Sequence, residues 1–553
     1  MNSNRSRLTL FLPFLLGAAI ASGVFIGYFL SGSTSIGKHN SSISGVGKDN
    51  KLNDVLNYII EEYVDTINTK KLEEDAIVSL LQQLDPHSAY IPAAELQGVS
   101  EQLEGNFDGI GVEFNIQHDT IMVVAAITGG PSESLGIQSG DRIVRIEGKS
   151  IAGIGVKNED VIKKLRGKRG TKVKVGIYRP STRRITDYVI TRGQIPIYSV
   201  DASYMATPDI GYIKISRFAA TTYDEYLKAF NELSMAGMKK LILDLRDNPG
   251  GYLNAAVDLC DEFLPKGKKI VYTQGKARKR EDFDATAKGG FESGGLVILI
   301  DEGSASASEI VSGAVQDNDR GWVVGRRSFG KGLVQEEVRF DDSSAMRLTI
   351  ARYYTPTGRC IQKSYKEGSD AYYHELGERY SRGEMASADS MKSMKGIAFK
   401  TPAGRVVYGG GGIMPDVFVP IDTSGYSIYL SEIAAKGLIN QFVFEYVDSH
   451  REEIKKQYKT ADSFARSFPI QNVLSGFSAF TIKNGVKSDP ASLNRSSEII
   501  RSQILALMGR AIYGNKGFYS ILNSRDKAVI KAIELLNSNK LVSNSSNAKP
   551  SAF

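Results

Sequence analysis

The sequence predicts a multidomain protein of mixed α/β (α+β) class. Its 553 residues exceed the roughly 250–300 residues at which single hydrophobic cores stop growing. Apolar residues recur with a helical period near both ends of the chain, and with a period close to two from about residue 109. Between residues 195 and 360, apolar strands run into glycine-rich turns and then into helices. These patterns predict terminal helices, a β-rich domain and an α/β core.

The composition is that of a globular protein and does not indicate a nucleic-acid partner. Hydrophobic residues make up 42% of the chain and charged residues 24%, and the net charge is +7. The densest basic cluster, residues 276–280, is followed at once by Glu281 and Asp282. We therefore expect a solvated loop there.

Residues 1–30 predict a signal or anchor segment. Leu8 to Leu30 carry no charge and are long enough to cross a bilayer of about 30 Å. Arg5 and Arg7 precede this run, which predicts a cytoplasmic N-terminus and an exported remainder. A signal-peptidase site at 19–21 is the alternative, but the run continues apolar beyond it. We expect a single-pass anchor in the inner membrane, with the rest of the chain on the periplasmic side.

The next segments predict a tether and a helical N-terminal region. Residues 31–50 are rich in Ser, Gly, Asn and Lys, which is typical of a flexible linker. Within 51–98, apolar residues follow helical spacing over 52–64 and again over 72–84, and the second helix should end at Pro86. His87, in the turn that follows, is more often structural than catalytic. The amphipathic helices are plausible contacts of a homo-oligomer.

The segment 99–185 predicts a small β-domain. It begins near Gly109-Ile110-Gly111-Val112 and contains a Gly-Asp-x-Ile-x-x-Ile-x-Gly turn at 140–148. A glycine-bracketed turn before a strand can offer backbone N–H groups to a carboxylate, and a strand edge can accept an extended peptide. Together the motifs resemble a circularly permuted PDZ domain, which implies that Ile110, Gly111 and Val112 contact the peptide. A β-barrel without a ligand is the alternative.

The α/β core is predicted over 186–424. An apolar strand at 241–245 runs into Asn248-Pro249-Gly250-Gly251, where glycines would let the backbone approach a ligand closely. A phosphate-binding loop is the competing interpretation, but its glycine fingerprints do not occur in this segment. A polar insertion at 363–410 is expected to be a surface excursion. The range 425–537 predicts a helical C-terminal domain, and 538–553 a disordered tail.

Ser306 stands in the turn after a second apolar strand, at 296–300, where a helix is expected to begin. The free N–H groups and the dipole of a helix N-terminus favour developing negative charge. Taken alone, Ser306 with Glu309 three residues later also fits a capping box, which would explain both residues.

A serine nucleophile needs a base, and histidine is a poor candidate in this chain. None of the five histidines lies in a glycine-rich or strand-end context, and no G-x-S-x-G elbow occurs. Lys331, between Gly330 and Gly332, could serve if desolvation lowers its pKa. Ser328 and Lys331 also match the S-x-x-K of penicillin-binding enzymes, but the glycines disfavour the helix which that motif needs.

Two motifs together resemble the carboxyl-terminal processing proteases, also called tail-specific proteases, over about residues 50–420. Ser304-Ala305-Ser306-Ala307-Ser308-Glu309 matches the nucleophile motif of that family, and Phe329-Gly330-Lys331-Gly332-Leu333-Val334-Gln335 matches its base motif. Further matches occur at 353–362 and 412–416, whereas the insertion between them departs from the shortest members.

The resemblance implies a crotonase-like ββα protease core and a serine endopeptidase without cofactor or metal. Ser306 would be the nucleophile, Lys331 the general base and Gln335 the residue that orients it. The oxyanion donors would be the N–H of Ala307 and of Gly250 or Gly251. The implied substrates are exported or membrane proteins, recognised by their C-termini through the PDZ domain. A catalytically silent PDZ scaffold or chaperone, and a phosphate- or acyl-CoA-binding α/β enzyme, are the alternatives.

Overall fold

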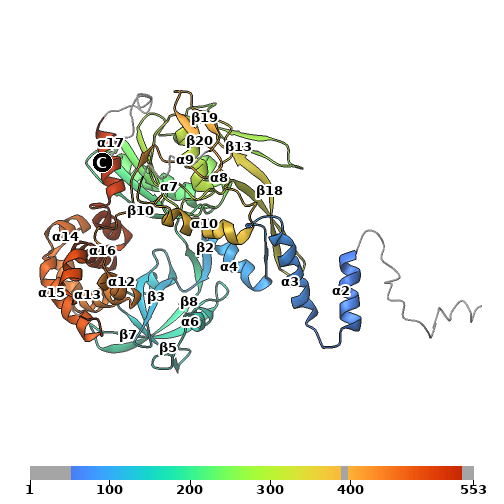
Figure 1. Cartoon of the computed structure of the whole chain (residues 1–553). Helices are drawn as coiled ribbons and strands as arrows, with labels where there is room; N and C mark the ends of the chain where they lie inside the picture. Colours follow the sequence, from blue (N-terminus) through green and yellow to red (C-terminus); the bar gives the residue numbers. More distant parts are fainter. Residues whose placement is uncertain (1–50, 388–395, 488, 539–553) are drawn as a thin grey trace, which may run out of the picture. The chain divides into compact units, whose positions relative to one another are not determined.

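The computed structural model describes residues 51–387, 396–487 and 489–538 (Figure 1). They belong to two compact units, divided between Ala76 and Ile77. The expected anchor at 1–30, the tether at 31–50 and nearly all of the predicted tail lie outside the described residues. Among the helices that are described, none combines the length and the apolar character needed to cross a bilayer. The predicted mixture of helices and sheets is confirmed.

The first unit contains α2 (Lys51–Glu62) and the beginning of α3 (Thr69–Gln82), where the sequence predicts two helices. α2 buries none of its residues. Its apolar side chains, among them Leu52, Tyr58 and Ile60, are exposed. The second unit begins within α3 and continues through α4 (Ala93–Glu104).

The β-domain contains a six-stranded sheet with the order β3-β4-β5-β7-β8, in which β6 pairs with β5 (Figure 1). Its strands are β3 (Val112–Gln117), β4 (Thr120–Ala126), β5 (Arg142–Ile146), β6 (Lys149–Ser150), β7 (Lys172–Arg179) and β8 (Arg184–Thr191). Two helices, α5 (Pro131–Ser134) and α6 (Asn158–Leu165), complete it. β3 lies at the edge of this sheet. A short ribbon of β2 (Asn106–Gly109) and β9 (Gly193–Pro196) pairs the segments that flank the domain.

The α/β core is built on a second six-stranded sheet, with the order β10-β11-β12-β15-β16-β21. All neighbouring strands are parallel except β10 and β11. The strands are β10 (Val200–Met205), β11 (Ile210–Ile215), β12 (Lys240–Asp244), β15 (Gly295–Ile300), β16 (Trp322–Gly325) and β21 (Val417–Phe418). Such strands read as continuous apolar runs because both faces are buried.

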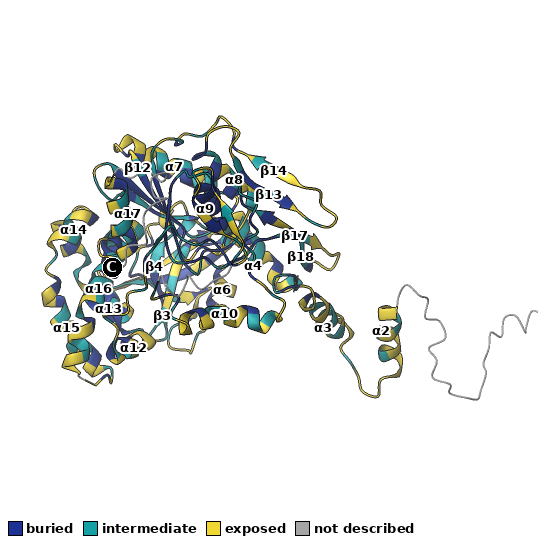
Figure 2. Cartoon of the chain, turned by 45° about the horizontal axis from the view of Figure 1, so that its top comes forward, coloured by how far each residue is buried: buried dark blue, intermediate teal, exposed yellow. Residues whose placement is uncertain are grey.

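Helices cover both faces of this sheet. α7 (Thr222–Met235), α8 (Leu253–Asp261) and α9 (Ala307–Asp317) contribute to one apolar core, and every residue of α9 is buried (Figure 2). The opposite face is covered by α17 (Lys527–Asn537), whose Val529 and Ala532 pack with sheet residues such as Ile242. The range 425–537, predicted as one helical domain, therefore divides between two hydrophobic cores.

A third sheet, with the order β1-β18-β13-β14 and with β17 paired to β18, lies beside the core. Its strands are β1 (Ala89–Ile91), β13 (Lys269–Gln274), β14 (Glu281–Asp284), β17 (Leu333–Arg339) and β18 (Ala345–Tyr354). Because β1 and β17 both pair with β18, this sheet brings residues near 88 close to the strand that follows Lys331.

The insertion at 363–410 differs from the expected surface excursion. It forms α10 (Ser369–Ser381) and the hairpin of β19 (Ala398–Lys400) and β20 (Val406–Tyr408). Tyr372 and Arg379 of α10 are only 2% and 1% exposed. The sequence did not predict this burial, because the inward-facing side chains of α10 are charged or hydroxylated groups that form hydrogen bonds, and polar segments are usually exposed.

The C-terminal helices form a core of their own. They are α12 (Ile428–Ala435), α13 (Leu438–Gln457), α14 (Ala461–Ser467), α15 (Ile470–Lys483) and α16 (Pro490–Asn523). α16 is broken at Gly514, which has φ 71° and ψ −163°. Beyond the break, Tyr519 and Asn523 hydrogen-bond to Asp201 and Tyr204 of β10, so the chain returns to the α/β core before α17.

Candidate active site

Two loops meet at the carboxyl ends of β12 and β15, which are adjacent parallel strands. The loop after β15 donates to the loop after β12 through Ser304 Oγ to Leu245 O at 2.8 Å and Ser308 Oγ to Asn248 O at 3.0 Å. The Ala305 N–H also donates to Asn248 O at 2.9 Å. Parallel strands place their following loops at one edge, which is where ligands bind in open α/β sheets. These bonds fix the turn that carries Ser306 against the glycine loop.

Ser306 immediately precedes α9 in a conformation that is rare for a residue with a side chain. Its φ is 54° and its ψ is −113°. Strain of this kind is concentrated at functional sites and persists only where the surroundings enforce it. Ser306 and Glu309 form the capping box that the sequence indicates, in which the Glu309 carboxylate accepts the Ser306 N–H at 2.9 Å. The Ser306 hydroxyl makes no well-formed cap hydrogen bond, so capping does not exclude a chemical role for this half-buried residue.

The glycine loop approaches this turn more closely than any residue with a side chain could. A Cβ at Gly250 would lie 2.7 Å from Ser306 Cβ and 2.9 Å from Ala307 N. The Gly250 N–H donates to Asn248 Oδ1 at 2.9 Å. Among the described residues, the N–H groups of Ala307 and Gly251 have no acceptor. The glycine loop thus packs against the turn of Ser306 through Gly250, and of the two glycines Gly251 is the one whose N–H has no acceptor among the described residues.

Lys331 and Gln335 are also brought together. Lys331 Nζ donates to Gln335 Oε1 at 2.9 Å, and Gln335 Nε2 donates to the His87 carbonyl at 2.6 Å. A register shift at Val334 and Gln335 in β17 marks a bulge, which is a common device for redirecting a side chain. Burial lowers the pKa of Lys331, and the charge of Arg347 lowers it further. Lys331 is therefore suited to accept a proton.

Glu309 connects Ser306 to Lys331 in a way the sequence analysis did not anticipate. One carboxylate oxygen accepts the backbone N–H of Ser306 at 2.9 Å and that of Lys331 at 2.8 Å. The other accepts the Gly330 N–H at 2.8 Å and the Ser328 hydroxyl. Burial raises the pKa of Glu309 to about 7, against the effect of these four donors. Among the described residues, Lys331 Nζ donates to Gln335 and not to Ser306 Oγ. Ser306 and Lys331 are therefore connected through their backbone N–H groups, which share the Glu309 carboxylate.

His87 is a second residue whose contribution to the site was missed. Its carbonyl holds Gln335, and its ring Nε2 lies 2.8 Å from the Tyr372 hydroxyl. Burial and the nearby Lys331 lower the pKa of His87 to about 4, so the ring is neutral at pH 7. In the sequence, the turn Asp85-Pro86-His87-Ser88 was the one feature that pointed to this residue. In the structure His87 holds other residues in place through its carbonyl and its ring.

Ile110, Gly111 and Val112 form a separate surface in the β-domain. Gly111 has φ 76°, and a Cβ there would lie 3.3 Å from Gly130 Cα. The carbonyls of Ile110 and Gly111 accept bonds from Ser132 and Ile127, whereas their N–H groups have no acceptor among the described residues. These free donors lie beside the edge strand β3, an arrangement that suits a peptide carboxylate followed by an added strand.

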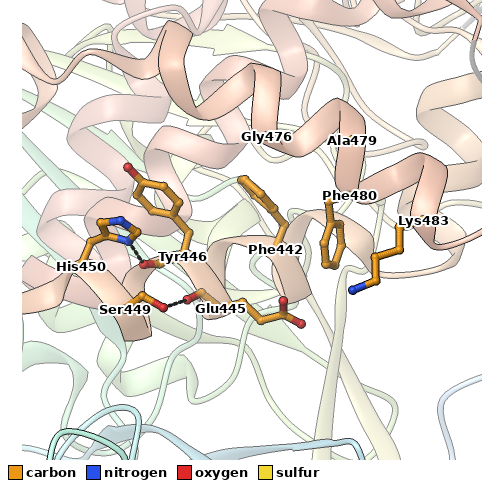
Figure 3. Close-up of a pocket in the computed structure, with 9 residues that line it drawn as sticks. All are labelled: Phe442, Glu445, Tyr446, Ser449, His450, Gly476, Ala479, Phe480 and Lys483. Carbon is orange, nitrogen blue, oxygen red and sulfur yellow. Dashed lines mark hydrogen bonds between the residues drawn. The ribbon is translucent and has the colours of Figure 1, made fainter.

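A hollow of another kind lies between α13 and α15. Figure 3 shows this open groove, about 400 Å³ in volume, with the rings of Phe442, Tyr446 and Phe480 along it. The Tyr446 ring stacks on His450 at 4.2 Å between centroids. The groove contains none of the predicted catalytic residues. Across the described ranges, no cluster of three His, Cys, Asp or Glu residues could hold a metal ion.

Comparisons with known proteins find relatives for most parts of this chain. Residues 209–368 match the model of peptidase family S41, residues 122–179 match a PDZ domain, and residues 429–514 match a family of unknown function, DUF8443. Carboxy-terminal processing protease CtpA of Bacillus subtilis (strain 168) is 34% identical over 360 residues, which cover 65% of this chain and 76% of that protein. The carboxy-terminal-processing protease of Bartonella bacilliformis is 36% identical over 319 residues, covering 56% and 72%. The solved structure of the photosystem II D1 C-terminal processing protease is 27% identical in sequence. The match covers 56% of this chain and 89% of that chain, with a TM-score of 0.32.

Proposed function

The chain belongs to the carboxy-terminal processing proteases of peptidase family S41, and we propose that it cleaves exported proteins near their C-termini with a Ser306–Lys331 dyad. As a member of this family with a PDZ domain, it is a serine peptidase that acts on proteins or peptides. The residues of the dyad, the class of substrate and the cellular location are the proposed parts.

The observation that carries the proposal is the setting of the Lys331 amine. It is buried, its pKa is lowered, and its one described partner is the Gln335 amide oxygen. A neutral amine can accept the proton of a serine hydroxyl, whereas an ammonium group cannot. The shared Glu309 oxygen keeps the Lys331 backbone close to the Ser306 backbone.

The proposed reaction is acyl transfer in two steps. Lys331 takes the Ser306 proton as Ser306 Oγ attacks the peptide carbonyl, and the N–H groups of Ala307 and Gly251 stabilise the oxyanion. The Lys331 ammonium then protonates the departing amine as the C–N bond breaks. In the second step Lys331 takes a proton from water as the water oxygen attacks the ester. The Lys331 ammonium then returns this proton to Ser306 Oγ as the ester C–O bond breaks and the new C-terminal carboxyl group is released.

Substrate selection is proposed to begin in the PDZ domain. The free N–H groups of Ile110 and Gly111 would bind the terminal carboxylate, and the peptide would pair with β3 from Val112 onward. Backbone pairing provides affinity that depends little on sequence, so the apolar side chains near the C-terminus would determine preference.

Cleavage of a peptide with an apolar C-terminus tests the dyad. Ser306→Ala and Lys331→Ala should each abolish cleavage, and Lys331→Arg should be equally inactive because guanidinium remains protonated. The exposed Lys366→Ala is the control and should keep full activity. A serine-directed phosphonate should label the protein and fail to label Ser306→Ala. Substantial cleavage by Ser306→Ala or Lys331→Ala would refute the dyad, and a silent scaffold would show no labelling at all.

We also propose that residues 1–30 anchor the protein in the inner membrane with its catalytic part in the periplasm. The uncharged run after Arg5 and Arg7 supports this location. The full chain should remain in the membrane pellet after carbonate extraction, and protease added to spheroplasts should digest it. A variant that lacks 1–30 should be absent from the pellet. Full-length protein in the soluble fraction would contradict the anchor.

Self-association through α2 is a further part of the proposal. Leu52 and Val55 lie three residues apart on one face of α2 and form an exposed apolar set on a helix that buries none of its residues. A second copy could cover this set, as in other amphipathic helices. Sedimentation should show a dimer or larger species that Leu52→Lys/Val55→Lys converts to monomer. A monomeric wild-type protein would rule this out.

A further inference from the structure

The helix α10 lies in the insertion at 363–410. Its buried side contacts the residues that precede Lys331 in the chain, and also His87 and Gln362, which hydrogen-bond to Gln335 and Gly332 beside the base. We propose that α10 positions the general base, and that Tyr372 and Arg379 are its positioning residues. The inference rests on the proposed dyad of Ser306 and Lys331, and it assigns a role to a part of the chain outside both catalytic motifs.

The first line of contact runs from Tyr372 to the amine of Lys331. The Tyr372 hydroxyl lies 2.8 Å from His87 Nε2, and the His87 carbonyl accepts Gln335 Nε2 at 2.6 Å. Gln335 Oε1 in turn accepts Lys331 Nζ at 2.9 Å. These three contacts connect α10 to the amine through His87 and Gln335, so a shift of α10 should be transmitted to the amine.

The same hydroxyl reaches the C-terminal side of the base. Gln362 Nε2 lies 3.3 Å from the Tyr372 hydroxyl, and Gln362 Oε1 accepts the Gly332 N–H at 2.8 Å. Gly332 directly follows Lys331. The hydroxyl of Tyr372 therefore restrains Lys331 through its side chain and through its backbone.

Arg379 restrains the segment that lies N-terminal to Lys331. Its guanidinium donates to the carbonyls of Arg327 at 2.7 Å and Ser328 at 3.1 Å, and Glu384 balances its charge at 3.0 Å. Burying a guanidinium costs free energy unless its donors are satisfied, and here it is satisfied mainly by the loop that leads to Lys331. This arrangement joins the insertion to the base loop.

Such a restraint matters because the base loop is intrinsically flexible. Gly330 and Gly332 flank Lys331, and Gly330 has φ 93°. Glycines impose few limits on the backbone, so the sequence of the loop alone does not fix the amine. Misplacement of a catalytic group by about 1 Å can cost roughly 100-fold in rate. Contacts from outside the loop must supply the precision. Glu309 holds the backbone of Gly330 and Lys331, and α10 adds restraints on both sides of Lys331.

Tyr372→Phe tests the role of the hydroxyl with a minimal change. Loss of the hydroxyl removes its hydrogen bonds to His87 and Gln362, and should lower kcat for the apolar C-terminal peptide roughly 3- to 10-fold and leave KM unchanged. The rate of phosphonate labelling of Ser306 should fall by the same factor. Tyr380→Phe makes the identical change on the same helix at a side chain that is 62% exposed, and it should leave both rates unchanged.

Arg379→Met and Arg379→Lys test the second contact. The Met variant should lose at least about tenfold in kcat, and the Lys variant should recover part of it because an ammonium group can still donate to one carbonyl. If the Met variant does not fold, Tyr372→Phe decides, since it removes a single oxygen.

The outcomes separate this inference from the proposed function. If Ser306→Ala or Lys331→Ala still cleaves, the dyad itself is refuted. If both are inactive while Tyr372→Phe and folded Arg379→Met keep wild-type kcat and labelling rates, only the role of α10 is refuted. A rise in KM without a fall in kcat would also overturn the positioning role, because it would show that α10 contacts substrate.

Discussion

At the residue scale, the carboxylate of Glu309 determines how the proposed nucleophile and base stand relative to each other. It is fully buried and accepts four hydrogen bonds from the two catalytic loops. A carboxylate is the one side chain that offers only acceptors at both oxygens. Replacing it with an amide of the same shape would present donors to donors.

We expect Glu309→Gln to impair both activity and stability. An amide has one acceptor oxygen, so two of the four donors would face an NH₂ group, and a buried donor without a partner costs about 1–3 kcal/mol. Cleavage and phosphonate labelling should fall by at least about 100-fold, and chemical denaturation should show a lower free energy of unfolding. Glu336→Gln changes an exposed carboxylate and is the matched control. Wild-type labelling of Glu309→Gln would show that the carboxylate does not hold the site.

The pH dependence of cleavage should report the protonation of Lys331. Because burial and Arg347 lower the pKa of Lys331, the neutral form appears below the ordinary value of 10.5, and kcat/KM should rise with pH to a midpoint below it. Glu309 and Asp85 act in the opposite direction. Arg347→Met removes a positive charge, which raises the pKa of Lys331 and should move the midpoint to higher pH.

Arg339→Gln is the control for that shift. Arg339 shares the partner Glu337 with Arg347, but it is exposed and does not influence Lys331. Its pH profile should match that of the wild type. An unchanged midpoint in Arg347→Met would mean that the rising limb belongs to another group.

Sequence motifs identified the residues that meet at this site, and their catalytic roles stay predictions. Ser306, Lys331 and Gln335 were found because their residue types and spacing are characteristic of one chemistry. Glu309 was interpreted only as a cap, since its second contact is with a loop about twenty residues away. The carbonyl of His87 could not be predicted at all, because backbone groups leave no mark in a sequence.

At the scale of secondary structure, α17 shows that apolar periodicity predicts where a helix forms, but not which surface that helix packs against. The spacing of apolar residues gives the buried side of α17, but not the surface that it covers. Asp526 caps this helix through the N–H groups of Ala528 and Val529 and pairs with Arg246, which in turn binds Asp244 at the end of β12. α17 is thus connected to the strand from which the glycine loop begins.

Val529→Asp should therefore destabilise the α/β core. Val529 is 2% exposed against the sheet, and a buried carboxylate without a partner costs several kcal/mol. The melting temperature should fall by many degrees, and cleavage should be lost with it. Ile530→Asp introduces the same group one residue later, where the side chain is 40% exposed, and should be tolerated. Equal melting temperatures for the two variants would contradict the packing of α17 on this sheet.

At the scale of the whole molecule, the PDZ domain contacts the C-terminal helices through polar groups. Arg142 pairs with Asp448 at 3.0 Å, and Arg510 of α16 pairs with Glu113 of β3 at 2.9 Å. Arg451 also donates to Ser139 at 3.0 Å. The order of domains was predictable from composition and periodicity. This contact was not predictable, because a charged surface residue in a sequence does not indicate which residue it will pair with.

Polar contacts between partly exposed groups contribute little and are screened by salt, so the docking of the PDZ domain should be weak and adjustable. In Asp448→Asn/Arg510→Gln, both domains should stay folded, while amide hydrogen exchange accelerates in residues 138–142 and in α13. Raising salt to about 0.5 M should produce the same change in the wild type. Lys436→Gln removes an ion pair within the C-terminal helices and should not have this effect. Unchanged exchange in the double variant would show that other contacts hold the PDZ domain in place.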